Sequence, residues 1–224
     1  MRVAVVVFPG SNCDHDAYHV IQHLLNIDVD FVWHKEKDLS KYGAVIVPGG
    51  FAYGDYLRAG AIARFSPIME EVIQFANRGK PVIGICNGFQ VLVESGLLPG
   101  ALINNKNIKF LSRDVCIRVE NSDTIFTSYY DEGDLLTIPI AHRQGNYFAK
   151  PDDIRQLKDN GQIAFTYHPQ DADGNPNGSL ESIAGILNDA KNVLGMMPHP
   201  ERAAEEILGA PDGLKIFQSM LGVS

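Results

Sequence analysis

The chain has 224 residues, of which 45% are hydrophobic and 21% charged, a composition typical of globular proteins. This length favours a single domain over residues 1–224 with a sizeable hydrophobic core. The net charge of −8 argues against a nucleic-acid-binding surface, because such a surface needs a basic patch.

The first segment is apolar over residues 3–8 and then meets Pro9 and Gly10, which predicts a central strand and a turn. The strand is too short for the apolar part of a signal peptide or for a membrane span, so we expect a cytoplasmic location and no membrane partner. Ser11 or Asn12 is expected to cap the next helix. Its predicted core face consists of Ala17, Val20, Ile21, Leu24 and Leu25.

Two groups of residues raise the question of a metal site. His15, His19 and His23 recur every fourth residue, but they lie opposite the apolar face of the predicted helix, which favours a solvated face over a zinc site. The cysteines are three in number and lack metal-ligand spacing, so we expect a reducing compartment and no metal in this chain. They are Cys13, Cys86 and Cys116.

The third predicted strand, residues 44–47, leads into a glycine pair. After the second strand (residues 29–33) and this one, the chain reads Pro48, Gly49, Gly50 and Phe51. Open α/β sheets bind ligands at the carboxyl ends of such strands. Two glycines leave backbone N–H groups unshielded, which suits an oxyanion hole, although a tight turn alone also explains them. A helix is predicted from Pro67 to Gly79.

The most informative stretch follows Pro81. Residues 82–85 predict a buried strand and Asn87–Glu94 a helix that ends at Gly96. The junction, Gly84-Ile85-Cys86-Asn87-Gly88, has the spacing of a nucleophile elbow with cysteine as its central residue. At the N-terminus of a helix the dipole favours the reactive thiolate of Cys86. A lone buried cysteine in a strand-to-helix turn is the alternative, and the paired glycines disfavour it.

Beyond Pro99 and Gly100 the pattern changes to shorter, partly alternating strands without helices between them. This pattern predicts antiparallel strands added to the parallel sheet. We predict strands over residues 110–119, 124–128, 135–140, 162–166, 183–187 and 193–197, with a short helix over residues 153–158. An open, mostly parallel, doubly wound (flavodoxin-like) sheet with added antiparallel strands is therefore the expected fold.

Residues 171–182 superficially resemble a calcium loop. An EF-hand requires glycine at the sixth position and glutamate at the twelfth, where this chain has Pro176 and Ser182. We therefore reject a calcium site.

Near the C-terminus the sequence Pro198-His199-Pro200-Glu201 supplies a possible base. Each proline disfavours helical geometry in the residue before it, so the segment is expected to be extended, with His199 and Glu201 on one side. The carboxylate can then fix the imidazole tautomer and leave the other ring nitrogen for Cys86. A Cys-His-Glu triad is the leading interpretation, and a loop histidine beside a solvated glutamate is the alternative.

These motifs resemble those of the class I, triad-type glutamine amidotransferases. The sequences Gly84-Ile85-Cys86-Asn87-Gly88-Phe89-Gln90 and Pro198-His199-Pro200-Glu201 carry the resemblance. The stretch over residues 47–62 is similar to one branch, the glutamine amidotransferase subunits of phosphoribosylformylglycinamidine synthase. The likeness begins near residue 3, covers most of the chain, and implies a single glutamine amidotransferase type 1 domain.

The resemblance also implies roles and partners. Cys86 corresponds to the nucleophile, His199 to the base and Glu201 to the residue that orients it. Backbone N–H groups at Gly50, Phe51 and Asn87 correspond to the oxyanion hole, and Gln90 to a residue that holds glutamine. The family pattern implies a large synthetase subunit, often with a small third subunit. No phosphate-loop motif occurs in the sequence, so ATP and Mg²⁺ are expected on the partner.

Two rival interpretations remain at this stage. A cysteine hydrolase of the DJ-1/PfpI type commonly has histidine directly after the nucleophile, where this chain has Asn87. A non-catalytic, partner-binding subunit has no need of Cys86, His199 and Glu201 together. One departure from the family is visible: Arg143-Gln144 stands where the branch often has glycine and an acidic residue, so no role is transferred to that loop.

Overall fold

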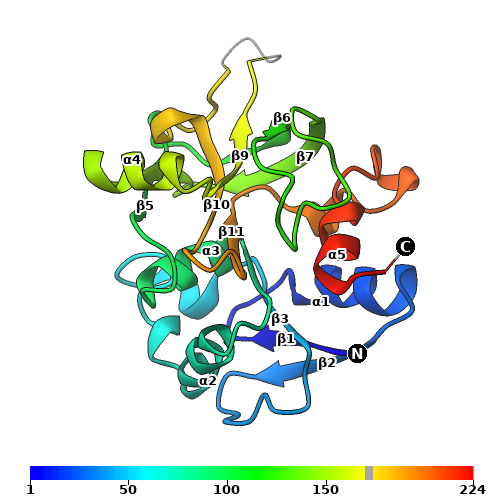
Figure 1. Ribbon diagram of the computed structural model, residues 1–224. Helices are drawn as coiled ribbons and strands as arrows, with labels where there is room; N and C mark the ends of the chain where they lie inside the picture. Colours follow the sequence, from blue (N-terminus) through cyan, green and yellow to red (C-terminus); the bar gives the residue numbers. More distant parts are fainter. Residues whose placement is uncertain (170–173, 224) are drawn as a thin grey trace.

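The structure, a computed structural model, describes residues 1–169 and 174–223. A nine-stranded mixed sheet forms its centre, with strand order β2-β1-β3-β4-β11-β10-β9-β6-β7 (Figure 1). The strands are β1 (Arg2–Val7), β2 (Asp28–Trp33), β3 (Ala44–Val47), β4 (Val82–Ile85), β6 (Leu111–Val119), β7 (Leu135–His142), β9 (Ile163–Tyr167), β10 (Ile183–Leu187) and β11 (Val193–Met196).

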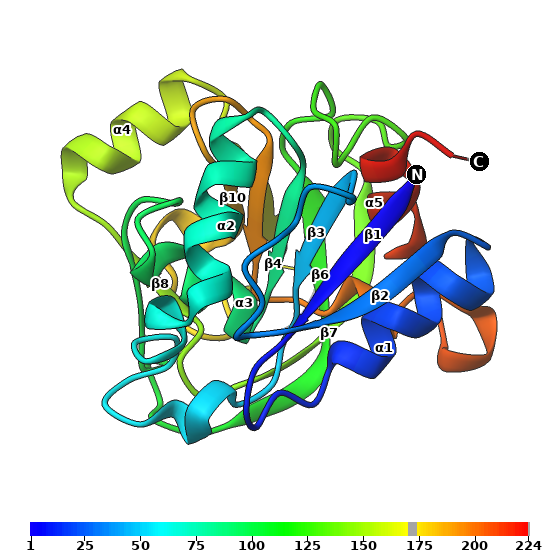
Figure 2. The ribbon, with the colours of Figure 1, turned by 90° about the horizontal axis from the view of Figure 1, so that it is seen from below.

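One half of the sheet is parallel: β2, β1, β3, β4 and β11 all run in the same direction. Helices cover both faces of this half, α1 and α5 on one side and α2 and α3 on the other (Figure 2). Burial on both faces explains why β3 and β4 are continuous apolar runs without a polar residue. The helices are α1 (Asp14–His19), α2 (Pro67–Asn77), α3 (Asn87–Glu94), α4 (Pro151–Asp159) and α5 (Leu214–Leu221).

The other half of the sheet is antiparallel, as the alternating patterns predicted. Strand β10 pairs antiparallel with both β11 and β9, and β6 pairs antiparallel with β9 and β7. The fold class expected from the sequence is therefore confirmed. The site described below lies at the carboxyl ends of the parallel strands β3, β4 and β11, next to the antiparallel half of the sheet.

The strand predicted over residues 124–128 is wrong. This segment forms turns, because the Thr124 hydroxyl accepts the N–H of Phe126 at 3.1 Å and the Thr124 carbonyl accepts the N–H of Thr127 at 3.2 Å. Such local hydrogen bonds replace the ladder that a strand would need. Phe126 is nevertheless fully buried, so its apolar character reflects insertion into the core.

Other local differences are smaller. Helix α1 begins at Asp14 after Cys13 and has no side-chain cap, in contrast to the expected cap at Ser11 or Asn12. The helix continues as a π-helical stretch over Val20–Leu24. A separate two-stranded sheet of β5 (Ala101–Ile103) and β8 (Asn146–Phe148) was not predicted, nor was α5.

The three histidines at four-residue spacing are exposed, as expected for a polar helix face.

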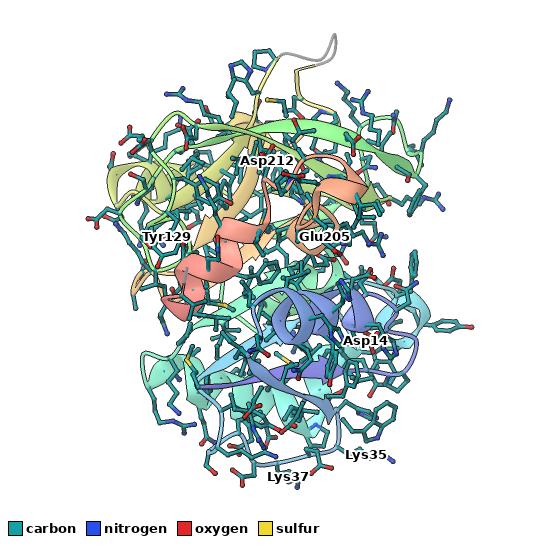
Figure 3. All side chains as sticks on the ribbon, turned by 90° about the vertical axis from the view of Figure 1, so that its right-hand side faces the viewer. Asp14, Lys35, Lys37, Tyr129, Glu205 and Asp212 are labelled. Atoms are coloured by element: carbon teal, nitrogen blue, oxygen red, sulfur yellow. The ribbon has the colours of Figure 1, made fainter. Side chains whose placement is uncertain are left out.

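The segment after β11 is tied to both halves of the molecule (Figure 3). Glu205 Oε1 lies 2.8 Å from His19 Nε2 on α1, and Asp212 Oδ2 accepts the N–H of Thr137 on β7 at 2.7 Å. Among the described residues, no helix combines the length and the apolar character that crossing a membrane requires.

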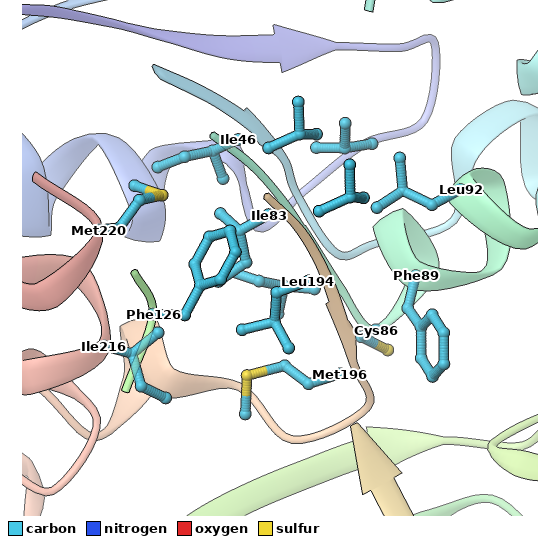
Figure 4. Packing of buried hydrophobic residues seen from close by; sticks show 14 of the residues in the cluster. Ile46, Ile83, Cys86, Phe89, Leu92, Phe126, Leu194, Met196, Ile216 and Met220 are labelled. Atoms are coloured by element: carbon cyan, nitrogen blue, oxygen red, sulfur yellow. The ribbon is translucent and has the colours of Figure 1, made fainter. Parts of the chain in front are cut away.

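The core covers both faces of β4 and β11 (Figure 4). Ile83, Leu194 and Met196 lie on the same side as Phe126 and Ile216, whereas Phe89 of α3 packs on the other face, against Gly195. Cys86 lies where β4 ends, at the margin of this cluster. The backbone that carries the thiol is therefore surrounded by buried side chains.

Candidate active site

The junction of β4 and α3 has the geometry of a nucleophile elbow. Cys86 adopts φ 50° and ψ −104°, a sparsely populated conformation that the surrounding structure must hold in place. The two glycines make the sharp turn possible. A Cβ at Gly88 would lie 1.8 Å from the carbonyl oxygen of Val47, and a Cβ at Gly84 would lie 2.8 Å from the backbone of Gly88. At both positions the neighbouring backbone lies too close for a side chain, as the elbow geometry requires.

His199 and Glu201 form a buried pair. Nδ1 of His199 lies 2.6 Å from Oε1 of Glu201, and the two residues are 1% and 4% exposed. The His199 backbone N–H donates to the Pro139 carbonyl at 2.8 Å, which anchors the segment to β7. Because the carboxylate accepts the Nδ1 proton, Nε2 remains available for proton transfer. It has no hydrogen-bond partner among the described residues.

The glycine pair brings the elbow and the histidine together. A Cβ at Gly49 would lie 2.8 Å from Cε1 of His199, 3.3 Å from Sγ of Cys13 and 3.4 Å from Cβ of Cys86. Only glycine therefore allows the thiol and the imidazole to converge here. Burial acts to lower the pKa of His199, but the carboxylate of Glu201 and the neighbouring Cys86 and Cys13 sulfurs outweigh it and hold that pKa well above its usual value.

Two backbone N–H groups beside Cys86 are unused. Gly50, at φ 128°, makes no hydrogen bond through its N–H within the described ranges. The N–H of Asn87 belongs to the first turn of α3, which has no intrahelical acceptor. The Phe51 N–H instead donates to the Gly10 carbonyl at 3.3 Å. Of the two loop donors expected from the sequence, the structure thus leaves Gly50 free and engages Phe51.

Asn87 and Gln90 connect three walls of the site. The Asn87 side chain accepts the Ala52 N–H at 3.0 Å and donates to Asp55 at 3.1 Å and to Gln90 at 2.9 Å. Gln90 in turn donates to the Gln144 carbonyl at 2.6 Å. Gln90 is 5% exposed, so it is a buried part of this network and not a solvated surface residue.

A pocket of about 310 Å³ opens over the thiol. Its walls come from the glycine loop, the elbow and helix α3, and the loop after β7. They consist of Gly50, Phe51, Asp55, Cys86, Gln90, Phe110, Ala141, His142, Arg143 and Gln144. Its size and the polar groups around the nucleophile suit a small polar substrate.

The loop after β7 is held from behind by buried amides. Asn105 donates through Nδ2 to the carbonyls of Lys109 and His142, so its Oδ1 accepts from His142 Nδ1 and from the Gly145 N–H. Burial, together with the neighbouring His199, lowers the pKa of His142 to about 3, which keeps that ring neutral.

The sequence around residues 171–182 also contributes to this loop. Asn177 donates to the Gly145 carbonyl at 2.7 Å, so residues 174–179 support the loop that lines the pocket. Residues 171–173, the start of the rejected calcium motif, lie outside the described residues.

Cys13 and Arg202 were not predicted as site residues. Arg202 Nη2 donates to Cys13 Sγ at 3.0 Å, and its Nε donates to Asp16 Oδ2 at 3.0 Å. Cys13, His199 and Glu201 offer ligand atoms within 4.8 Å of one another, but the guanidinium against the Cys13 sulfur opposes a cation at that point. In the sequence, only the position of Arg202 directly after Glu201 could have indicated that Arg202 lies near the site.

Comparisons with known proteins agree with this geometry. The CobB/CobQ-like glutamine amidotransferase domain matches residues 1–212. A chain in the structure of PurLQS from Thermotoga maritima is 47% identical, with a TM-score of 0.89, and the match covers 99% of this chain and 97% of that chain.

More distant structures share the fold. One is a glutamine amidotransferase from Thermotoga maritima, 17% identical with a TM-score of 0.63, matched over 99% of this chain and 96% of that one. Another is the glutaminase domain of Trypanosoma brucei CTPS with bound acivicin, 15% identical with a TM-score of 0.62, matched over 100% and 95%. With a family match over nearly the whole length and the elbow, histidine and glutamate in place, this chain belongs to the CobB/CobQ-like glutamine amidotransferases.

Proposed function

We propose that this chain is the glutaminase subunit of phosphoribosylformylglycinamidine synthase. It hydrolyses glutamine to glutamate and supplies ammonia to a synthetase partner, which converts formylglycinamide ribonucleotide to the amidine with ATP in purine biosynthesis. The observation that carries the proposal is the convergence of Cys86 and His199 around Gly49, next to the free Gly50 N–H, in a chain 47% identical to one in PurLQS.

The chemistry follows from the geometry. The Cys86 thiolate attacks the side-chain amide carbon of glutamine, and the N–H groups of Gly50 and Asn87 stabilise the oxyanion, each by roughly 3–4 kcal/mol in comparable sites. The carboxylate of Glu201 and the Cys86 sulfur raise the pKa of His199 and so favour the protonated imidazole, which gives its proton to the leaving ammonia. Neutral His199 then activates the water that hydrolyses the thioester. Glu201 holds the ring in the required tautomer throughout.

We propose that another chain consumes the ammonia, and no phosphate-loop motif occurs in this sequence. We assign ATP, Mg²⁺ and the ribonucleotide to a large synthetase subunit, and we expect a small third subunit in the same complex. Two large apolar side chains that line the pocket, Phe51 and Phe110, are exposed, which is consistent with a covered state in the assembly.

A glutamine analogue that carries an electrophilic diazoketone tests the assignment of the nucleophile. We expect it to alkylate Cys86 and to spare Cys13 and Cys116, because only Cys86 combines the elbow geometry with the free N–H groups. Peptide mapping of the modified chain, alone and with the partner, is the measurement.

Cys13 makes this test demanding, since its sulfur also lies beside His199. Competition with glutamine should slow the labelling of Cys86, whereas an untargeted alkylating agent of similar size should show no such protection. An adduct found mainly on Cys13 would move the active site and contradict the triad.

A further inference from the structure

Two opposite charges line the same pocket as the thiol. Asp55 contributes a carboxylate from the glycine-rich loop, and Arg143 contributes a guanidinium from the loop after β7. Neither residue was expected to act on the substrate, and Arg143 is part of the departure from the related sequences.

Asp55 is a partly buried carboxylate without a cationic partner. Its Oδ1 accepts one hydrogen bond from Asn87 Nδ2 at 3.1 Å, and no lysine, arginine or histidine of the described residues forms an ion pair with it. Burial raises its pKa to about 6. The residue also sits at φ 54°, a strained conformation for a non-glycine residue, so the loop holds the carboxylate in place at a cost.

Arg143 has the complementary situation. It is exposed at the pocket rim, and its guanidinium forms no hydrogen bond or ion pair within residues 1–169 and 174–223. Its backbone is nevertheless fixed, because the Arg143 carbonyl accepts the Asn105 N–H at 2.8 Å and the next carbonyl, of Gln144, accepts from Gln90. A rigid backbone therefore carries an unpaired, planar donor group to the pocket.

We propose that Asp55 binds the α-ammonium group of glutamine and Arg143 its α-carboxylate, so that the amide end is delivered to Cys86. This rests on the proposed glutaminase function and names how the same pocket selects its substrate. Glutamine is a zwitterion with both charges on one carbon, at the far end from the reactive amide. A guanidinium suits a carboxylate, which it can bind through two parallel hydrogen bonds.

The link to the reacting atoms is direct. Asn87 donates to Asp55 and also accepts the Ala52 N–H, and its own backbone N–H is one of the proposed oxyanion donors. An ammonium group bound at Asp55 therefore contacts the same network that positions the oxyanion loop. Amides without an ammonium and a carboxylate group on the α-carbon would leave Asp55 and Arg143 without ligands, and they are expected to be poor substrates.

Two truncated substrates allow each charge to be tested separately. 4-Carbamoylbutanoate keeps the amide and the carboxylate but lacks the ammonium, and 4-aminobutanamide keeps the amide and the ammonium but lacks the carboxylate. Binding is measured by calorimetry on the Cys86→Ala chain carrying either Asp55→Asn or Arg143→Gln. Hydrolysis is measured on the complex with the synthetase partner.

Each variant should weaken glutamine binding by about 10- to 100-fold, the loss expected for a hydrogen bond to a charged group. Asp55→Asn should change the affinity for 4-carbamoylbutanoate less than about threefold, and Arg143→Gln should do the same for 4-aminobutanamide. In the hydrolysis assay the loss should appear mainly in KM. Asp159→Asn, an exposed acid on α4, is the matched control and should bind glutamine like the parent chain.

The proposal would be overturned if either variant lowered the affinity for glutamine by less than twofold. It would also be overturned if a variant lowered the affinity for glutamine and for the analogue without the charge bound by the replaced residue by the same factor. In both cases the glutaminase assignment would stand. The proposed function itself would instead be contradicted if the Cys86→Ala chain failed to bind glutamine and the complex containing the parent chain released no glutamate.

Discussion

Replacement of Cys86 by serine should abolish glutamine-dependent amidine formation, by roughly 10,000-fold or more, and spare synthesis from added ammonium salts. Serine is close to cysteine in size, so the strained backbone of the elbow should stay as it is. Its hydroxyl, however, is a far weaker nucleophile than a thiolate. The partner subunit consumes ammonia whatever its source. The measurement is amidine formation by the assembled complex with each nitrogen donor.

The matched control is Cys116→Ser, which changes a thiol on β6 in the antiparallel half and should leave both activities at the parent level. Complex assembly is checked for each variant by co-purification. If ammonia-driven synthesis disappeared in an intact Cys86→Ser complex, the division of labour between the two subunits would be wrong.

The isolated chain should release glutamate roughly 100- to 1,000-fold more slowly than the chain in complex with its synthetase partner, ATP and ribonucleotide. The physical reason is the Phe51 N–H, which would add a third oxyanion donor to those of Gly50 and Asn87 but here donates to the Gly10 carbonyl at 3.3 Å. Loss of one such donor has an effect of this size in related chemistry. The adjacent Gly49 and Gly50 allow the peptide planes to reorient with little steric cost.

The loop that follows is the expected contact with the partner. Tyr56 and Leu57 are 75% and 90% exposed, while Arg58 is fixed by an ion pair with Glu94 on α3. Docking on these side chains can shift the Phe51 peptide. Tyr56→Ser should reduce the activation by the partner without changing glutamate release by the isolated chain. Equal turnover with and without partner in the parent protein would refute this switch.

Local signals predicted the central part of this fold well. Strand β3 and helix α3 begin and end where the sequence placed them, because proline, glycine and buried apolar runs determine these boundaries within a few residues. The elbow was predictable for the same reason, since Gly84, Cys86 and Gly88 are neighbours in the chain. His199 and Glu201 were identified from the Pro198-His199-Pro200-Glu201 segment, but the extended geometry expected there is wrong, since Pro200–Arg202 form a short 3-10 helix.

Features that depend on distant contacts were not predictable. Cys13 gave no sign in the sequence of lying near the site, yet it contacts Arg202, far along the chain, and lies close to His199. Asp55 gives no local sign of lining the pocket, because only the folding of three separate loops around Cys86 brings it there. Residues 124–128 looked like a strand because Phe126 is apolar, but a threonine hydroxyl decided the local geometry.

The covalent intermediate tests the central claim most directly. The complex is mixed with glutamine labelled in its carbon chain, quenched in acid during turnover, and digested to peptides. We predict label bound to the peptide that contains Cys86 and released by hydroxylamine, as expected for a thioester between the Cys86 sulfur and the glutamyl carbonyl. Label on the Cys13 peptide, or glutamate formation at full rate with no protein-bound label at any time, would contradict the account.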